Sequence, residues 1–248
     1  MRFFGRARGD AEVHELPGVS VIYCGIDYAA FNAGVMGSGA VVDATDLQRR
    51  IEGPAEQFER RRLRWSYWYC DELVGEALTP QARMLLHRHG LSELTDAPGM
   101  VADRLSPVAR DLPAIEVRPV VDEITRAAFA HITSASFEVP WNICREVYGQ
   151  ERAWRGSFRG YVAFANGTAV SSTAVVVESG VAGVYSVGTI PGQRRRGYAE
   201  ALMRDVLDRV HRETGVERTV LQSTRNGFPM YMKMGYQRVA NYTVFISE

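Results

Sequence analysis

Hydrophobic and polar residues follow two periods along the chain, and this mixture predicts an α/β protein with a mixed sheet. Residues 198–214 repeat apolar side chains at helical spacing and carry charged side chains on the opposite face, which is typical of an amphipathic helix. Asn166-Gly167 separates the apolar runs 160–165 and 168–177 and therefore predicts a β-hairpin. Further strands are expected at 19–24, 31–36, 63–70, 115–120, 181–187, 218–222 and 236–246, and further helices at 44–61, 80–89, 122–136, 141–148 and 228–234.

One segment, 105–113, indicates how the chain is divided. It holds two prolines among polar and small residues, and a strand pattern follows it. We therefore expect an N-terminal part, residues 1–110, and a C-terminal part, residues 111–248. A turn is expected at 96–99, and strands and helices after the boundary follow the order of a mixed α/β layer.

Composition excludes several classes of protein. The 248 residues are 46% hydrophobic and 23% charged, which is ordinary for a globular protein. The 29 basic and 29 acidic side chains give no net charge, which argues against a strongly basic nucleic-acid-binding protein. Three cysteines without a CxxC pair indicate neither a disulfide framework nor a zinc site, so no metal is expected. Met1–Asp10 lacks the apolar core of a signal peptide, and no run approaches the ~18 apolar residues of a membrane span. We therefore expect a cytoplasmic protein without a membrane partner.

Candidate chemistry gathers at residues 184–200, where an apolar strand leads through a loop into the amphipathic helix. Gly197 allows a tight turn and the close approach of a ligand to the main chain. The first N–H groups of a helix are unpaired and lie at the positive end of its dipole, so they can bind phosphate oxygens. Arg194, Arg195 and Arg196 add positive charge. A phosphorylated ligand is expected here, and the alternative is a solvated turn with three surface arginines.

Two motifs in the C-terminal part resemble those of one enzyme family. The sequence R-R-R-G-Y-A at 194–199 is similar to the Q/R-x-x-G-x-G/A signature of the GNAT superfamily of acyl-CoA-dependent N-acyltransferases. The sequence G-F-P-M-Y-M-K-M-G-Y at 227–236 resembles the family's G-x-P-L-Y-x-x-x-G-F segment. The resemblance covers residues 115–245 and implies the GNAT acyl-CoA N-acyltransferase fold for the C-terminal half.

The resemblance also implies roles for individual residues. Val187 and Thr189 would hydrogen-bond the pantetheine arm and the acyl group through their main chain, and the N–H of Val187 or Gly188 would meet the oxyanion. Tyr231 would protonate the departing thiolate of CoA, with packing as its alternative role. Asn226 would either contact CoA or cap a helix. The pyrophosphate would be held by the signature residues Arg194, Arg195, Arg196, Gly197, Tyr198 and Ala199.

The general base is left open. Some relatives carry a glutamate in the strand before the signature, where Gly183 stands in this sequence. The remaining options are a water relayed by Ser186 or Tyr185, or a carboxylate from elsewhere such as Glu138.

Aromatic clusters predict where an acceptor binds. One cluster includes Phe31 with Asn32 in the N-terminal half, and another includes Phe137 and Trp141 beside Glu138. A pocket lined by aromatic rings with a polar anchor suits a small amine with an apolar or cyclic body. Packing in the core is the alternative for each ring.

The N-terminal half resembles an incomplete copy of the same fold without the signature, as in two-part bacterial GNAT proteins. We expect an N-acetyltransferase that passes the acetyl group of acetyl-CoA directly to a primary amine of a small molecule. It would be a monomer or homodimer without a nucleic-acid partner. A longer acyl-CoA donor or a hydroxyl acceptor would leave the same signature, and a non-catalytic acyl-CoA-binding regulatory module is the third interpretation.

Overall fold

The computed structural model describes residues 12–37 and 39–248, and the expectation that Met1–Asp10 is no signal peptide lies outside them. The fold is mixed α/β with a mixed sheet, as the sequence predicts. The chain forms two compact units. The first holds the described residues up to Gly99 together with 223–226 and 238–248, and the second holds 100–222 and 227–237. Among the helices of the described residues, none is both long and apolar enough to cross a membrane.

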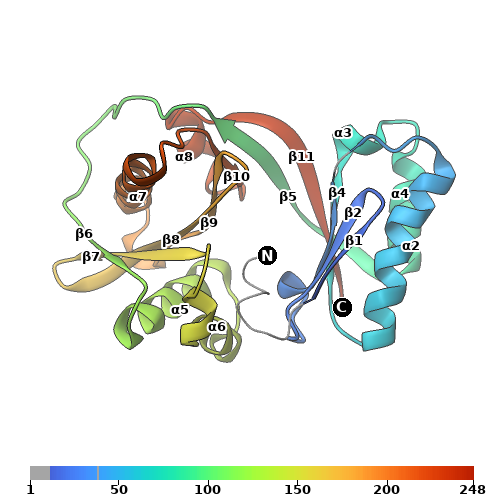
Figure 1. Ribbon diagram of the computed structural model, residues 1–248, viewed down its shortest axis with the longest axis horizontal. Coiled ribbons are helices and arrows are strands. Elements are labelled where there is room, and N and C mark those ends of the chain that lie inside the picture. The colour runs from blue at the N-terminus through green and yellow to red at the C-terminus, as the bar shows by residue number, and fades with distance from the viewer. Residues whose placement is uncertain (1–11, 38) are drawn as a thin grey trace. The chain divides into compact units, whose positions relative to one another are not determined.

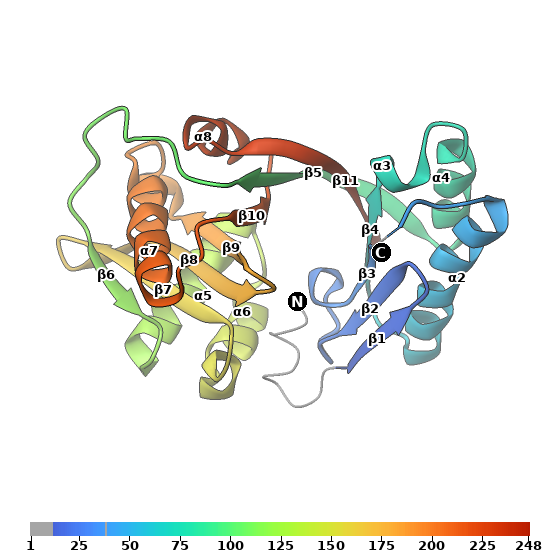
Figure 2. The same cartoon turned by 45° about the horizontal axis from the view of Figure 1, so that its top comes forward.

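In the first unit, helices cover one face of a sheet with the strand order β1-β2-β3-β4-β11-β5 (Figure 2). Strands β3 and β4 are parallel and α2 joins them, whereas β1 and β11 run antiparallel to their partners β2 and β4. Leu47 of α2 and Leu86 of α4 are buried in one core with Tyr67 and Tyr69 of β4. The elements are β1 (Glu12–Leu16), β2 (Val19–Tyr23), η1 (Ala29–Phe31), β3 (Ala33–Met36), α2 (Ala44–Arg61), β4 (Ser66–Cys70), α3 (Asp71–Val74), α4 (Thr79–Arg88), β5 (Leu91–Ala102) and β11 (Gln237–Ser247).

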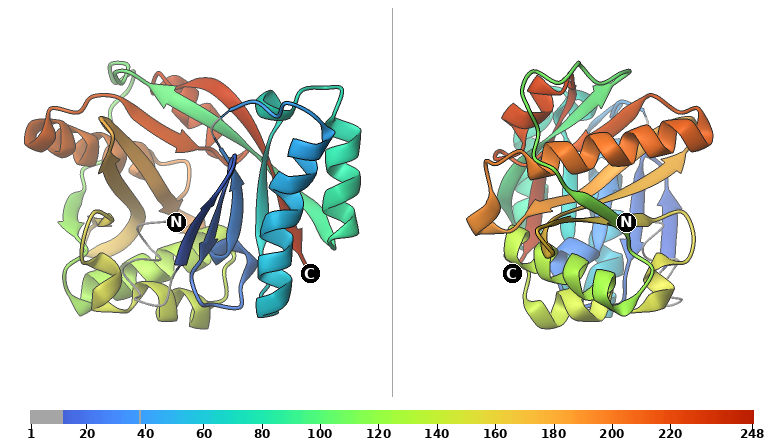
Figure 3. Two further views of the ribbon diagram at one scale, coloured as in Figure 1. Left: turned by 45° about the vertical axis from the view of Figure 1, so that its right-hand side comes forward. Right: turned by 90° about the vertical axis from the view of Figure 1, so that its left-hand side faces the viewer.

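In the second unit, α7 covers one face of the sheet, and α5 with its neighbour α6 covers the opposite face (Figures 1 and 3). The strand order is β10-β9-β8-β7-β6, beginning beside β5. Strands β9 and β10 are parallel and α7 joins them, while β6 to β9 are antiparallel. The elements are β6 (Glu116–Pro119), α5 (Glu123–Phe137), α6 (Trp141–Tyr148), η2 (Glu151–Trp154), β7 (Arg159–Ala165), β8 (Thr168–Glu178), β9 (Val181–Thr189), η3 (Pro191–Gln193), α7 (Tyr198–Thr214), β10 (Thr219–Gln222) and α8 (Phe228–Lys233).

Elements with a strong local pattern form where the sequence predicts them. Asn166 and Gly167 have φ angles of 51° and 75°, and they join β7 to β8 as the predicted hairpin requires. Helix α7 buries Leu202 and Val206 on one face, as its periodicity predicts. These outcomes follow from backbone preferences and spacing that act within a few residues.

Two local expectations differ from the structure. The turn expected at 96–99 is wrong, because these residues lie inside β5. Pro98 has no N–H, but its carbonyl accepts a hydrogen bond from the N–H of Ser223 at 2.9 Å, so the strand continues through it. Strand β1 was not expected. It is mostly polar and partly exposed, and it forms by pairing with β2 across a turn in which Gly18 has a φ of 76°.

The division of the chain also differs from the expected boundary at residue 110. Strand β5, which lies before that boundary, begins in the first unit and ends in the second, whereas β11, which lies after it, belongs to the first unit from residue 238 onward and pairs there with β4. The continuous parts 1–110 and 111–248 are therefore replaced by two units, each built from several segments. Prolines mark where the chain forms an irregular connection, but strand pairing depends on residues far apart in sequence.

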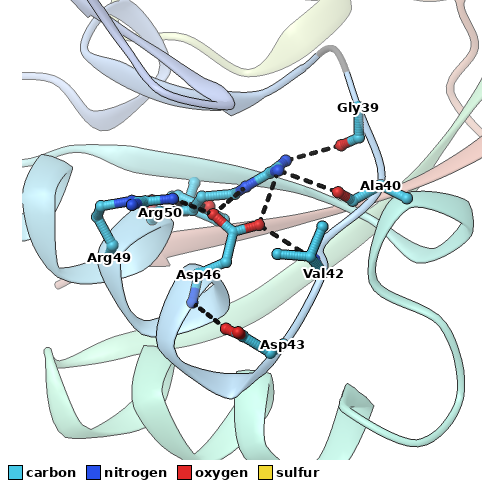
Figure 4. A network of polar contacts seen from close by, with 8 residues as sticks. Gly39, Ala40, Val42, Asp43, Asp46, Arg49 and Arg50 are labelled. Carbon is cyan, nitrogen blue, oxygen red and sulfur yellow. Dashed lines mark hydrogen bonds and ion pairs between the residues drawn. The ribbon is translucent and has the colours of Figure 1, made fainter.

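A buried ion pair fixes the connection between β3 and α2 (Figure 4). The side chains of Asp46 and Arg50 are 5% and 7% exposed, and they are 2.9 Å apart. Arg50 also donates to the carbonyls of Gly39 and Ala40, while Asp46 accepts from the N–H of Val42. The hydrogen bond from Arg50 holds the pKa of Asp46 below its ordinary value of 3.8. Among the described residues, Asp46 is the only carboxylate that pairs with Arg50.

We expect Asp46→Ala to lower the free energy of unfolding by about 3–5 kcal/mol, because Arg50 would be left buried without its counter-ion. Urea denaturation followed by circular dichroism measures this change. The control is Glu93→Ala, which removes a half-exposed partner of Arg83 and should cost about 0.2–1 kcal/mol. Because the pKa of Asp46 is lowered in the folded state, its contribution is present above pH 3.8 and is lost as the pH falls through the lower folded-state pKa. Equal losses in the two variants would contradict the assignment.

Candidate functional site

Strand β9 contains a bulge in its second half. Ser172 of β8 pairs with Gly188, and Ala174 pairs with Tyr185, so one β8 residue faces two residues of β9. The two are Ser186 and Val187. Ser186 has a φ of 51°, a left-handed conformation that is uncommon for a residue other than glycine. The bulge changes the direction in which the following main-chain groups point.

Three buried hydroxyl groups of β8 hold the bulge in place. Ser171 Oγ donates to the carbonyl of Gly188 at 2.6 Å, and Ser172 Oγ donates to that of Ser186 at 3.1 Å. Thr173 Oγ1 lies 3.5 Å from the carbonyl of Tyr185. All three hydroxyl residues are fully buried. Sequence reasoning missed them, although three consecutive hydroxyl residues within an apolar strand were a visible signal.

The other edge of β9 is open in the same region. Strand β10 pairs with β9 only at Ala182 and Gly183. The described residues of β10 therefore leave the rest of β9 unpaired on this edge. The carbonyl of Gly188 points to β8, and main-chain groups of successive strand residues point to opposite edges. The main-chain N–H of Val187 therefore points to the open edge, while its side chain packs against the core of the unit.

The loop after β9 turns sharply into α7. Arg195 and Gly197 both have left-handed φ angles, 65° and 89°. Gly197 is the N-cap of α7, and no side chain forms a cap hydrogen bond there. A Cβ atom at Gly197 would lie 3.1 Å from Cδ of Pro113, so a larger residue would be strained and crowded. Tyr198 and Ala199 form the first turn of α7, whose first N–H groups receive no hydrogen bond from a capping side chain.

The side chain of Arg194 is engaged within the protein. Its Nε donates to the carbonyl of Thr189 and its Nη2 to that of Ser136, both at 3.2 Å. Arg194 therefore connects the end of β9 to the last turn of α5. Arg195 and Arg196 are exposed and form no hydrogen bond or ion pair with a described residue, so their charge is available to a ligand.

Tyr231 lies in the core of the second unit. It is 6% exposed, in the same cluster as Val184 of β9 and Leu221 of β10. Burial, and secondarily the neighbouring Tyr236, raise the pKa of its phenol well above the ordinary value. The centroids of the two rings are 5.7 Å apart, and the Tyr236 hydroxyl accepts a hydrogen bond from Thr219 Oγ1 at 2.8 Å. Tyr231 itself forms no hydrogen bond with a described residue.

Gly183 stands where some relatives carry a glutamate, and the side chain of Tyr185 fills the space beside it. A Cβ at Gly183 would lie 2.7 Å from Oη of Tyr185, so the tyrosine folds back over the glycine. Burial raises the pKa of Tyr185. Glu138, the other candidate base, is exposed and ends α5 with a φ of 57°.

The residues expected at an acceptor pocket come from both units. In the first unit, Phe31 is buried in η1, and Asn32 is fully buried. The Asn32 amide accepts from the N–H of Cys24 and donates to the carbonyls of Ile26 and Arg64, so its hydrogen bonds are used within the chain.

In the second unit, Phe137 and Trp141 lie where α5 ends and α6 begins, and they are 38% and 46% exposed. Together with Glu138 they form an accessible aromatic and acidic group at this junction. Asn226 is exposed in the segment 223–226, which belongs to the first unit. No group of three His, Cys, Asp or Glu side chains that could hold a metal ion occurs in residues 12–37 and 39–248.

The chain is similar to known proteins in sequence and in fold. Residues 126–236 match the model of the Acetyltransferase (GNAT) family. The fold is similar to a GCN5-related N-acetyltransferase from Kribbella flavida, with 17% identity, a TM-score of 0.70, and coverage of 99% of this chain and 91% of that chain. It is also similar to a GCN5-related N-acetyltransferase from Sphaerobacter thermophilus, with 16% identity, a TM-score of 0.58, and coverage of 95% of this chain and 82% of that chain. A tandem GNAT protein from the clavulanic acid biosynthesis pathway is similar as well, with 13% identity, a TM-score of 0.61, and coverage of 93% of this chain and 78% of that chain. No curated protein matches the sequence.

We expect Arg194→Ala to loosen the end of α5, because it removes both hydrogen bonds that connect this turn to β9. Amide hydrogen exchange of the ligand-free protein should become faster in residues 133–139. Arg195→Ala is the matched control, since it removes the same charge from the same loop without removing a described hydrogen bond. Identical exchange in the two variants would show that Arg194 is not a structural connection.

Proposed function

We propose that this chain, which belongs to the acetyltransferase (GNAT) family through its residues 126–236, transfers an acyl group from acyl-CoA to an amine. The donor would be acetyl-CoA and the acceptor a primary amine of a small molecule. The observation that carries the proposal is that β9, which is bulged against β8 and open on its other edge, leads into a helix that begins at Gly197 without a side-chain cap. A donor with an amide-rich arm and a diphosphate matches both features.

The donor arm would run along the open edge of β9. Main-chain groups of Val187 and Thr189 would pair with the amides of the pantetheine, much as a neighbouring strand would. The diphosphate would lie against the N–H groups at residues 194–199, with Arg195 and Arg196 adding positive charge. Acyl-CoA is bound here as a substrate and is consumed in each cycle.

Two parallel crossovers in the described part of the chain support this assignment by contrast. In the first unit, β3-α2-β4 has its helix start occupied by its own carboxylates: Asp43 accepts from the N–H of Asp46 at 2.8 Å, and Asp46 accepts from Val42. In the second unit, the helix of β9-α7-β10 has no side-chain cap. We therefore propose that the first unit is a degenerate copy that binds no CoA, and that the second binds the donor.

The transfer itself would be direct. The lone pair of the neutral amine attacks the thioester carbonyl carbon, and the carbonyl oxygen gains negative charge that the Val187 N–H stabilises. The C–N bond forms, the C–S bond breaks, and the sulfur leaves with the electron pair. The amine loses one proton to water, and the thiolate gains one.

Tyr231 would assist the departure of the thiolate. A phenol is protonated at neutral pH, and burial raises the pKa of this one further, so it can donate a hydrogen bond to the sulfur as negative charge develops. Because burial holds this proton firmly, the hydrogen bond comes first and proton transfer follows the build-up of charge on sulfur. A longer acyl group or a hydroxyl acceptor would use the same geometry, whereas a non-catalytic sensor would bind acyl-CoA without turnover.

We expect Gly197→Glu to abolish CoA binding, because a side chain at a φ of 89° displaces the start of α7 and adds negative charge beside the phosphates. Isothermal titration calorimetry measures the dissociation constant, and circular dichroism checks the fold. Gly192→Glu is the control, since its Cβ would meet nothing within 4 Å and it adds the same charge to the same loop. Unchanged CoA affinity in folded Gly197→Glu would contradict the diphosphate site.

We expect Tyr231→Phe to lower kcat by about 100-fold or more, the range for loss of a general acid, with little change in CoA affinity. Steady-state kinetics of CoA release measures this. Tyr236→Phe is the matched control, because it removes a buried phenol that accepts a hydrogen bond from Thr219, and it should lower stability more than kcat. Wild-type kcat in Tyr231→Phe would assign this residue to packing, and CoA binding without turnover of any amine would favour the sensor.

A further inference from the structure

We infer that Thr133 and Ser136 of α5 form the subsite that holds the amino group of the acceptor, an inference that rests on the proposed transfer. Neither residue was singled out by the sequence.

The two hydroxyl groups lack partners inside the protein. Thr133 Oγ1 and Ser136 Oγ are both buried, and neither has a hydrogen-bond partner in the described part of the chain. Thr133 as a whole is 4% exposed. Burying a hydroxyl without a partner is unfavourable, and most buried polar side-chain atoms are paired. Thr133 and Ser136 are three residues apart, so they lie on one face of α5.

The last turn of α5 contacts β9 directly after the bulge through Ser136. A Cβ built on Gly188 would lie 2.7 Å from Ser136 Oγ and 3.3 Å from Cγ2 of Ile132. Glycine at 188 thus lets the Ser136 hydroxyl reach the main chain of β9, next to Val187. The hydrogen bonds of Arg194 to Ser136 and Thr189 fix this last turn of α5 relative to the strand.

The layers of the second unit separate the donor from the acceptor. Val184 packs into the core with residues of α7, and Gly188 faces α5 on the opposite side of the sheet. The diphosphate would lie at the start of α7, and the donor arm would fill the opening beside β9. The thioester carbonyl is then accessible to a nucleophile from the α5 side, where Thr133 and Ser136 lie.

Neutral hydroxyls suit an amine that must react in its uncharged form. Each oxygen can accept one N–H of the amine and leave the nitrogen lone pair directed at the carbonyl carbon. A carboxylate in this place would instead favour the protonated, unreactive ammonium ion. The hydroxyls orient the amine without taking its proton, which leaves to water as described above.

The test compares Thr133→Val, Ser136→Ala and the double variant with the wild type. Acetyl-CoA is the donor, and phenethylamine, tyramine, ethanolamine and putrescine are the amines. The amine with the highest wild-type kcat/KM is then used throughout. Each lost hydroxyl should raise KM for the amine by about 3- to 10-fold, as expected for one hydrogen bond, while KM for acetyl-CoA stays within about twofold.

Stability in the absence of ligand separates this role from packing. Removing an unpaired buried hydroxyl should leave Tm unchanged or raise it, because nothing is lost inside the protein. Ser134→Ala is the matched control on the same helix. Its hydroxyl donates to the carbonyl of Val139 at 2.8 Å, so its loss should lower Tm and leave the amine KM unchanged.

Two results would overturn the subsite alone: wild-type KM for the amine in the double variant, or a drop in its ligand-free Tm like that of Ser134→Ala. The absence of wild-type turnover with all four amines would instead contradict the proposed transfer, and the subsite would fall with it.

Discussion

The path of the β9 main chain is the constraint on which the rest of the second unit depends. The strand stays paired with β8 on both sides of its bulge but leaves β10 after Gly183. Separating two strands is costly because N–H and C=O groups lose their partners. The hydroxyls of Ser171, Ser172 and Thr173 hold the opposite edge, so the opening lies on one side of β9 only. A ligand with its own amides can then replace the missing strand.

Local strain supports the same geometry. Ser186 and Arg195 adopt left-handed backbone angles without being glycine, at a cost of roughly 1–2 kcal/mol each. Such conformations persist where the surrounding structure holds them. The carbonyl of Ser186 accepts a hydrogen bond from Ser172, and Arg194, the residue before Arg195, donates hydrogen bonds to carbonyls of α5 and β9. Tertiary contacts, rather than local preference, therefore give the loop its shape.

Each unit contains a parallel β-α-β crossover, and the starts of the two crossover helices differ. In the first unit, Asp43 and Asp46 fill the start of α2, and the buried pair of Asp46 with Arg50 closes the preceding loop. In the second unit, Gly197 begins α7 without a side-chain cap. One helix start is satisfied internally and stabilises the fold, while the other has no side-chain cap and would bind the diphosphate in the proposed function. A few residues at each helix start determine whether its N–H groups are capped.

The sequence by itself determined the elements and motifs that depend on neighbouring residues. The hairpin at Asn166-Gly167, the helix 198–214 and the loop that precedes it could be predicted, because φ preference and side-chain period act over a few positions. Only the tertiary structure decided that β11 pairs with β4, that β9 is bulged, and that Ser136 lies against Gly188. Each of these features depends on contacts between segments that are far apart in the chain. Such contacts do not produce a periodic pattern of residues in either segment.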